Sequence, residues 1–291
     1  MSYGFVPALG TPIDECGRLC KESYKKQIKM MIDAGAVGLL SMGSMGQQAY
    51  LLDGECRKVA ECAIEAAEGK VPVYVGTMDN SIERAKARMA ALEDLDIAAF
   101  VFTTPYYSVD NDEQVMEYFR SVAKATKHDI FLYDLAVVTK YKITYGMLCQ
   151  LRRDIPNLAG IKSADINMLR LVKHNPDFAG FKIFYSGLDS FDVVYPYGVG
   201  SILDGMLTCT PKTTRALVDA MDSGDMTSAA KHLNAIIELR DLFVDCDLWP
   251  AYTAAMNVLG CEGKHGPDWS ATPSAELTEK MRAALTKMGE I

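Results

Sequence analysis

Residues 158–165 read LAGIKSAD, an apolar run typical of a buried strand that ends on Lys162. An apolar run of this kind is typical of a parallel sheet with helices on both faces. Burying an ammonium group without a partner costs several kcal/mol. Lys162 is therefore expected to pair with an acid, to be lifted into a cleft at the strand end, or to stay neutral and act as a nucleophile.

A second apolar run precedes it in the chain. Residues 129–134 read DIFLYD, and Tyr133 holds the position that matches Lys162. If the two runs are adjacent parallel strands, their ends lie side by side. An amine that can form an imine beside a phenol that can move protons is the most specific chemical signal in the sequence.

The composition narrows the possible partners and the location. The chain has 291 residues, 49% of them hydrophobic, which suits one α/β barrel or two smaller domains. Lysine plus arginine number 30 against 38 aspartate plus glutamate, so the net charge is -8. This acidic balance argues against nucleic acids and anionic membranes as partners. With no basic leader and no run of about 18 apolar residues, a cytoplasmic location is expected.

No metal or cofactor is predicted. The eight cysteines are scattered, without a CxxC pair or a histidine at zinc-ligand spacing, and are expected to be reduced thiols in the core. The four histidines lie in polar or helix-end contexts. The expected strand ends also lack the carboxylate cluster that a divalent metal requires.

Apolar runs alternate with amphipathic patterns along the chain. The expected strands are residues 3–7, 38–42, 71–76, 98–103, 129–133, 158–162, 181–185 and 200–203. The helical patterns between them include residues 21–34, 53–68, 81–95, 112–126 and 144–153. Eight strands in strict alternation favour a closed (β/α)8 TIM barrel over an open doubly wound sheet. An open dinucleotide-binding sheet is also expected to carry GxGxxG after its first strand, where this chain reads LGTP (residues 9–12).

Four helical patterns make up the C-terminal part of the chain. They cover residues 213–223, 226–242, 250–259 and 274–288. The first is the expected eighth barrel helix and the others an appended helical unit. No linker or low-complexity segment separates the two. The expected division is a barrel over residues 1–222 and a helical extension over residues 223–291 that packs on it.

Barrel enzymes carry their chemistry at the C-terminal ends of the strands. One such end is the turn formed by Gly43, Ser44, Met45 and Gly46. Glycines three apart let backbone N–H groups point at an anion, and Ser44 adds a donor. A carboxylate is the expected guest, because the long glycine-rich loop for a polyphosphate is missing. The alternative is an ordinary strand-to-helix turn in which the glycines only relieve strain.

Five motifs in chain order carry a family resemblance. They are residues 7–12 (PALGTP), residues 43–47 (GSMGQ, similar to G-[ST]-T-G-E), residues 104–107 (TPYY), Tyr133 (similar to the start of Y-N-x-P) and residues 160–162 (GIK, similar to G-[IV]-K). In these motifs the chain resembles the dihydrodipicolinate synthase and N-acetylneuraminate lyase family. Its members are class I aldolases that bind pyruvate or another 2-oxo acid as a Schiff base on a lysine.

The resemblance implies roles for particular residues. Lys162 would form the imine, Tyr133 would transfer protons, and Ser44 with the backbone of the turn would hold the 2-oxo acid carboxylate. Tyr107 would reach Tyr133 across an interface of a homo-oligomer, a tetramer or a dimer, and complete a relay with Ser44. Without the resemblance, Tyr106 and Tyr107 are better explained as an aromatic pair packed under a helix.

Four positions depart from the family patterns. Met45 and Gln47 stand where the family has a second hydroxyl and a glutamate. Val138 stands where dihydrodipicolinate synthases carry an arginine for the second substrate's carboxylate, and Ala164 replaces a threonine of the sialic acid lyases. The resemblance therefore supports imine chemistry in this chain. It supports neither the second substrate of the dihydrodipicolinate synthases nor the substrate of the sialic acid lyases.

The expected function is that of a carbon–carbon lyase acting on pyruvate or another 2-oxo acid. For the far end of the substrate, Asp134, Asp189, Ser190 and Asp204 are the remaining polar residues at strand ends. Carboxylates accept hydrogen bonds from a polyol and repel a second carboxylate. A 2-keto-3-deoxy sugar acid is therefore expected, with Asp189 and Asp204 among its contacts, although Asp189 and Ser190 could instead cap a helix.

Two other functions stay open. One is a sugar-acid dehydratase or hydratase-aldolase that uses the same lysine on a different bond. The other is a barrel that binds a 2-oxo acid without turnover, since a fold does not fix a function.

Overall fold

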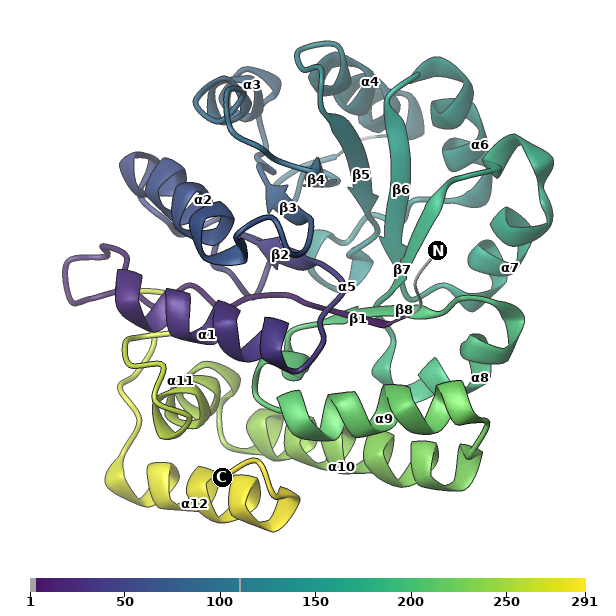
Figure 1. Cartoon of the computed structure of the whole chain (residues 1–291). Coiled ribbons are helices and arrows are strands. Elements are labelled where there is room, and N and C mark those ends of the chain that lie inside the picture. Colours follow the sequence, from purple (N-terminus) through teal and green to yellow (C-terminus); the bar gives the residue numbers. More distant parts are fainter. Residues whose placement is uncertain (1–3, 110) are drawn as a thin grey trace.

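The computed structural model describes residues 4–109 and 111–291, and its eight strands form a barrel surrounded by helices (Figure 1). The strands are β1 (Gly4–Pro7), β2 (Leu39–Ser41), β3 (Val73–Gly76), β4 (Ala99–Thr103), β5 (Asp129–Tyr133), β6 (Leu158–Ser163), β7 (Lys182–Tyr185) and β8 (Ser201–Asp204). The helices are α1 (Lys21–Asp33), α2 (Asp53–Ala67), α3 (Ile82–Ala90), α4 (Asp112–Ala123), α5 (Ala136–Thr139), α6 (Tyr145–Asp154), α7 (Ile166–His174), α8 (Phe191–Val194), α9 (Pro211–Ser223), α10 (Met226–Asp245), α11 (Leu248–Val258) and α12 (Ala275–Met288).

Neighbouring strands pair in parallel, in the order β1-β8-β7-β6-β5-β4-β3-β2. The barrel closes between β1 and β2, where the amides of Val37 and Leu9 donate to the carbonyls of Phe5 (3.0 Å) and Leu40 (2.9 Å). Because successive side chains of a strand alternate between its two faces, the core has an inner and an outer part. The inner part consists of Val6, Ala8, Leu40, Tyr74, Ala99, Val101, Phe131, Tyr133, Phe184 and Leu203.

The predicted (β/α)8 TIM barrel with added C-terminal helices is confirmed. Each strand begins and ends within two residues of its expected bounds, and residue 3 of the first prediction lies outside the described residues. The pattern over residues 81–95 gives a shorter helix, α3. The chain leaves the helix at Ala91, whose carbonyl accepts a hydrogen bond from the Arg57 side chain of α2 (2.7 Å). Helices α5 and α7 were not among the patterns named from the sequence, whereas α8 follows Asp189 and Ser190, which were expected to be able to cap a helix.

Side chains cap the N-terminal ends of several helices. Each capping oxygen accepts a hydrogen bond from the backbone amide three residues further on, which satisfies one of the free donors of the first turn. The capping residues are Ser81, Asn111, Thr144, Asp165, Asp225 and Ser274. The caps at Ser81, Asn111 and Asp165 fix where the loops after β3, β4 and β6 enter the following helices.

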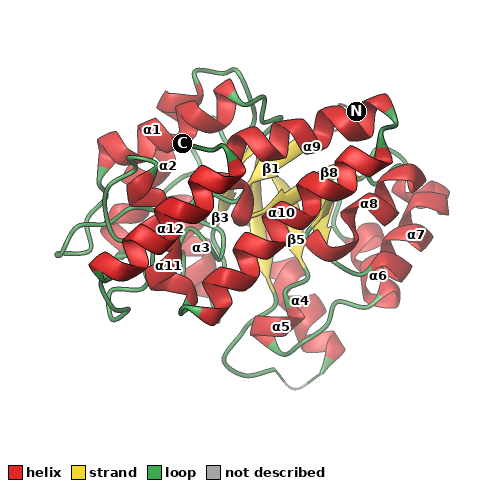
Figure 2. Ribbon diagram, turned by 90° about the horizontal axis from the view of Figure 1, so that it is seen from below, coloured by secondary structure: helices red, strands yellow, loops and turns green. Residues whose placement is uncertain are grey.

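The C-terminal helices α10, α11 and α12 gather on the side of the barrel where α9 lies (Figures 1 and 2). The carboxylate of Glu290 accepts the amides of Lys212 (3.0 Å) and Thr213 (2.8 Å) in the first turn of α9. Tyr252 of α11 shares a hydrogen bond with Thr208 after β8 (2.8 Å). The expected boundary between residues 222 and 223 falls in the last turn of α9, and the division into two parts stays a prediction.

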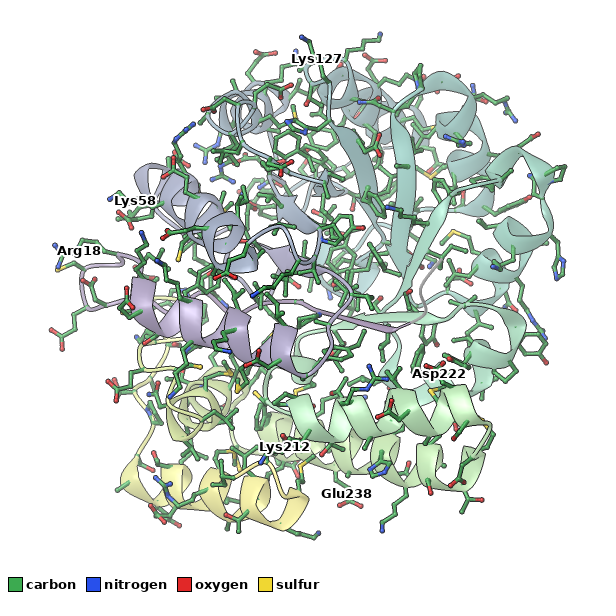
Figure 3. All side chains as sticks on the ribbon, viewed as in Figure 1. Arg18, Lys58, Lys127, Lys212, Asp222 and Glu238 are labelled. Carbon is green, nitrogen blue, oxygen red and sulfur yellow. The ribbon has the colours of Figure 1, made fainter. Side chains whose placement is uncertain are left out.

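Charged side chains cover the outside of the helical ring. Arg18, Lys58 and Lys127 are exposed and project away from the barrel (Figure 3). In the described part of the chain, none of the helices combines the length and the apolar character needed to span a membrane.

Candidate active site

Lys162 and Tyr133 lie side by side at the C-terminal end of the barrel. They are register partners on β6 and β5, and both side chains are 4% exposed. The Nζ atom of Lys162 lies 3.9 Å from the centroid of the Tyr133 ring. Among the described residues, no hydrogen bond or ion pair reaches this Nζ. The amine is therefore held against an aromatic face beside a phenol rather than in a salt bridge.

The turn after β2 presents backbone N–H groups that have no partner. The amides of Gln47 and Gln48 close the turn by donating to the carbonyls of Ser44 (3.3 Å) and Gly43 (3.4 Å). The N–H groups of Ser44, Met45 and Gly46, and the half-buried Ser44 hydroxyl, have no acceptor within residues 4–109 and 111–291. Successive free N–H groups of this kind form a concave site that suits an anion.

The glycines of the turn also have a packing role. A Cβ atom at Gly46 would lie 2.8 Å from the backbone nitrogen of Met42, and one at Gly43 would lie 2.8 Å from Cδ2 of Leu40. Thr11 donates its hydroxyl to the Gly46 carbonyl (2.7 Å) and holds the turn against the loop after β1. Packing is thus sufficient to explain the glycines, and the free N–H groups are the separate observation that points to an anion.

Met45 joins this turn to the end of β8. A Cβ atom at Gly205 would lie 2.2 Å from Cγ of Met45, so the methionine side chain packs directly on the Gly205 backbone. Gly205 follows Asp204, the last residue of β8. The loop after β2 and the loop after β8 therefore meet at the C-terminal end of the barrel.

Lys142 bridges two acids at the ends of β5 and β6. It forms an ion pair with the buried Asp134 and another with Asp165 (3.1 Å). Asp134 also accepts a hydrogen bond from the Ser163 hydroxyl (2.8 Å). Burial lowers the pKa of Lys142, but its hydrogen bonds to the two carboxylates outweigh this and leave the pKa raised. Asp134 is therefore neutralised and is not a free acceptor.

A cavity of about 350 Å³ lies at the ends of β5, β6 and β8, and neither Lys162 nor the turn of Gly43 to Gly46 is among its lining residues. It is lined by Tyr133, Asp134, Leu135, Ala136, Val137, Lys142, Ala164, Asp165, Ser186 and Asp204. The expected site residues Tyr133 and Asp204 thus share one cavity, although β5 and β8 are not neighbouring strands. The cavity is wide enough for a small organic acid.

Asp204 has one carboxylate oxygen in use. Its Oδ1 accepts the amide of Met206 (2.8 Å), and no cation forms an ion pair with it in the part of the chain that the structure describes. Burial raises the pKa of Asp204, while the charges of Lys162 and Arg240 act in the opposite direction. Asp204 is therefore a half-buried carboxyl group that accepts a backbone hydrogen bond and has no ion pair among the described residues.

Asp189 is already paired. Arg240 of α10 donates to its carboxylate (2.7 Å), and this hydrogen bond lowers the pKa of Asp189. Asp189 is not among the residues that line the cavity. Its expected contact with a substrate stays a prediction, and it would require the aspartate to share its carboxylate with Arg240.

Tyr107 lies away from the barrel interior. Its side chain is 91% exposed, and its backbone amide donates to Asn80 Oδ1 (2.8 Å), as does that of the half-buried Tyr106 (2.7 Å). A side chain so exposed is not packed under a helix, which rules out that explanation for Tyr107. Nor does it pack against the buried Tyr133 within one chain, so the relay expected from the resemblance needs a second copy.

The sequence analysis named neither Lys142 nor Arg240. Lys142 lies between α5 and α6 without a motif around it, and Arg240 lies 51 residues from Asp189 in the chain. The available signal was Asp134, because a buried carboxylate needs a cation and Lys142 is 8 residues away. No group of three or more His, Cys, Asp or Glu side chains is arranged to hold a metal ion among the residues described.

The chain as a whole is similar to known proteins. A model of the Dihydrodipicolinate synthetase family matches residues 1–290. The chain is 26% identical over 294 residues to a 4-hydroxy-tetrahydrodipicolinate synthase from Acidiphilium cryptum, and the match covers 99% of both chains. It is 27% identical over 252 residues to a protein of the same name from Salinibacter ruber, covering 85% of this chain and 82% of the relative.

Solved structures show the same fold. The N-acetylneuraminate lyase of Proteus mirabilis superposes with a TM-score of 0.90 at 20% identity, covering 100% of this chain and 99% of the lyase. YagE, an Escherichia coli prophage protein of the dihydrodipicolinic acid synthase family solved in complex with pyruvate, has a TM-score of 0.88 at 21% identity over 99% of each chain. At these identities the likeness concerns the fold alone.

Proposed function

Because the chain belongs to the dihydrodipicolinate synthetase family of lyases, we propose that Lys162 forms a Schiff base with pyruvate or another 2-oxo acid. The enzyme then makes or breaks a carbon–carbon bond next to the imine. The observation that carries the proposal is the contact between the Lys162 amine and the Tyr133 ring. It supports the proposal because an amine beside a phenol at the C-terminal end of a barrel can act as a nucleophile next to a proton-transfer group, and such enzymes carry their chemistry at this end.

The retained residues support a sequence of steps. The neutral amine of Lys162 attacks the ketone carbon and gives a carbinolamine. Tyr133, which lies beside the amine, can donate the proton that lets this intermediate lose water and become the imine. The protonated imine then accepts the electron pair of the bond between the third and fourth carbons of the substrate, so that this bond breaks, an aldehyde leaves and an enamine forms. Protonation and hydrolysis of the enamine release the 2-oxo acid.

The turn after β2 is the proposed site for the carboxylate of the 2-oxo acid. The free amides of Ser44, Met45 and Gly46 and the Ser44 hydroxyl can donate hydrogen bonds to its oxygens. Hydrogen bonds to a charged acceptor contribute about 1.5 to 3 kcal/mol each. Such contacts hold the acid in a fixed orientation with its ketone at the amine.

The charges of the cavity support a substrate with a neutral, hydroxylated tail. Three carboxylates, Asp134, Asp165 and Asp204, and one ammonium, that of Lys142, line it. The acids outnumber the cation, so a second carboxylate on the substrate would be repelled. Hydroxyl groups can donate to the carboxylate of Asp204. A 2-keto-3-deoxy sugar acid has both the 2-oxo acid head and a tail of this kind.

The proposed assembly is a homo-oligomer in which a second copy covers Tyr107. Tyr107, in the loop after β4, is 91% exposed, and an aromatic side chain of this kind is well suited to an interface between copies. In the proposed arrangement the partner brings its own Tyr107 towards Tyr133 and Ser44.

The proposal is tested by borohydride reduction with a panel of pyruvate, 2-oxobutyrate and 2-keto-3-deoxygluconate, followed by peptide mass spectrometry. The expected result is an adduct on the peptide that contains Lys162, with the mass of the acid less one water plus two hydrogens. Lys162→Ala should abolish the adduct. Absence of an adduct with every acid, or its survival in Lys162→Ala, would show that the chemistry is wrong.

A second strand lysine provides the matched control. Lys182 begins β7 at the other end of the barrel, and its Nζ lies 6.0 Å from the centroid of the Tyr74 ring. Lys182→Ala should leave both the adduct and its rate of formation unchanged. A steady-state assay of 2-keto-3-deoxygluconate cleavage, detecting pyruvate, then separates an enzyme from a barrel that binds the acid without turnover.

A further inference from the structure

Lys142 and Asp165 place a hydrogen-bond donor and an acceptor side by side in the wall of the cavity at the ends of β5, β6 and β8. The Nζ atom of Lys142 lies 3.1 Å from Oδ2 of Asp165, and both residues line the cavity. Their side chains are 44% and 27% exposed, so solvent reaches both groups. A ligand that enters the cavity can therefore contact the ammonium and the carboxylate together.

The ammonium of Lys142 has a donor in excess of its partners. An ammonium group carries three N–H donors. Two of those of Lys142 serve Asp134 and Asp165. No other hydrogen bond or ion pair of this ammonium occurs within residues 4–109 and 111–291. The third N–H is therefore left for a ligand of the cavity.

Hydrogen bonds on the protein side hold the pair in place. Asp165 caps α7 by accepting the amide of Met168 at Oδ1 (2.9 Å), and its own amide donates to the Ser163 hydroxyl (3.1 Å). The Ser163 hydroxyl donates in turn to Asp134 (2.8 Å), which forms the other ion pair of Lys142. The two groups are thus positioned before a ligand binds, which lowers the entropic cost of binding it.

Tyr133 joins this cavity to the reactive lysine. It lines the cavity, and its ring lies 3.9 Å from the Nζ atom of Lys162. Asp134 follows Tyr133 in the chain and Ser163 follows Lys162, so the groups that hold the pair belong to the same two strand ends. A 2-oxo acid bound to Lys162 can therefore extend along Tyr133 into the cavity. The phenol then lies beside the first carbons of the substrate, and the cavity takes the later ones.

Two neighbouring hydroxyl groups are the ligand chemistry that fits an ammonium beside a carboxylate. A hydroxyl both donates and accepts, so one can donate to Asp165 while its neighbour accepts from Lys142. Both hydrogen bonds involve a charged partner, which makes them stronger than neutral ones. An anionic group would be repelled by the three carboxylates of the cavity, and an apolar group would leave the third N–H without an acceptor.

We propose that Lys142 and Asp165 bind the terminal diol of the substrate, the hydroxyls on its fifth and sixth carbons, an inference that rests on the proposed function. Lys142 donates to one hydroxyl, and Asp165 accepts from the other. The pair thereby selects six-carbon 2-keto-3-deoxy sugar acids over acids that end at the fourth carbon. Neither residue makes or breaks a covalent bond, so both determine binding of the tail rather than the chemistry at Lys162.

The test compares two acids that differ in the diol. 2-Keto-3-deoxygluconate carries it, whereas 4-hydroxy-2-oxobutanoate has the same reacting groups and ends at the fourth carbon. Wild-type kcat/KM should be about 10- to 100-fold higher for the longer acid. Lys142→Met should raise its KM about 10- to 100-fold with kcat changed less than about threefold. The KM for the shorter acid should change less than about twofold, because this acid does not reach the pair.

Asp165→Asn is a second variant, and it leaves the ion pair between Lys142 and Asp134 intact. Asparagine still caps α7 but is a weaker, neutral acceptor, so the KM for the longer acid should rise about 3- to 10-fold. Lys140→Met is the matched control. Lys140 donates to the Val137 carbonyl and does not line the cavity, so this variant should keep the wild-type KM for both acids.

Three results would overturn the assignment of the pair. The first is a KM that rises equally for the two acids in both variants, which would mean that the pair maintains the fold of the site and does not read the diol. The second is an equal wild-type kcat/KM for the two acids, a measurement that does not depend on the folding of any variant. The third is trapping of pyruvate on Lys162 without cleavage of either acid. If the wild type traps no 2-oxo acid at all, the proposed function itself fails, which is a distinct outcome.

Discussion

The Nζ atom of Lys162 lies 3.9 Å from the centroid of the Tyr133 ring, and the two residues are register partners on neighbouring strands. Backbone pairing fixes their relative position, because β5 and β6 are bonded along their length. The ring, rather than the hydroxyl, is the part of Tyr133 that contacts the amine. Packing and proton transfer by Tyr133 can therefore be separated by one substitution.

Tyr133→Phe keeps the ring against Lys162 and removes only the hydroxyl. We expect kcat for cleavage to fall about 100- to 10,000-fold, the usual contribution of a positioned acid or base. The borohydride adduct should still form, but more slowly, since the amine and its packing are intact. Adding borohydride at several times after mixing and quantifying the adduct measures the rate at which the imine forms. Adduct formation at the wild-type rate would show that the phenol plays no part in forming the imine.

Val138 predicts weak activity with aspartate semialdehyde as second substrate. Val138 is 57% exposed on α5, next to Val137, which lines the cavity, and the family resemblance places an arginine at this position. Losing a bidentate arginine contact to a carboxylate costs about 2 to 5 kcal/mol. Condensation with pyruvate in a coupled assay should be absent or very weak, and Val138→Arg should increase it. Efficient turnover by the wild type would contradict this prediction.

Removing the cation between Asp134 and Asp165 should destabilise the fold. Lys142→Met leaves the buried Asp134 charge without its ion pair, which typically costs about 3 to 5 kcal/mol for fully buried pairs. Lys142 is 44% exposed, so we expect a smaller loss of about 1 to 2 kcal/mol in the free energy of unfolding at pH 7. Urea denaturation measures it. Lys140→Met is the control, because Lys140 donates to the Val137 carbonyl and has no ion pair with any described residue.

His265 should make stability fall in acid. It is fully buried, its Nε2 contacts the Cys261 carbonyl (2.8 Å), and burial lowers its pKa from 6.5 to about 4. Between these two values the unfolded chain binds a proton that the folded chain does not, so stability decreases as the pH falls from 6.5 to 4. The contribution of this group is about 3 kcal/mol between pH 7 and pH 4.

The measurement is the pH dependence of urea denaturation in the wild type and in His265→Gln. Acidic residues contribute to both curves, so the difference between them isolates the histidine. Parallel curves would mean that His265 is protonated without cost in the folded state.

The barrel could be predicted from the sequence because its strands are nearly continuous apolar runs. The same signal located Lys162 and Tyr133, since a polar residue that ends an apolar run is placed by the strand itself. Helix α7 was missed among the named patterns, although Asp165 caps its first turn. The pairing of strands, and thus the adjacency of the two residues, followed from chain order alone.

The charge state of the site could not be predicted in the same way. Asp134 and Asp189 both follow strands and look like free acceptors in the sequence. Their cations, Lys142 and Arg240, come from a loop and from a helix far along the chain, and no local pattern signals such a contact. Asp204 was placed correctly at a strand end, but the absence of an ion pair to it within residues 4–109 and 111–291 is a property of the folded chain.

The contact between Met45 and Gly205 constrains the order in which this sequence can change during evolution. Gly205 has an ordinary helical backbone (φ −75°), which alanine adopts without strain, yet an alanine Cβ would overlap Met45. A mutation at position 205 is therefore deleterious while Met45 is present and becomes acceptable once a smaller residue stands at position 45. The two positions are therefore coupled, so position 45 has to change to a smaller residue before position 205 can diversify.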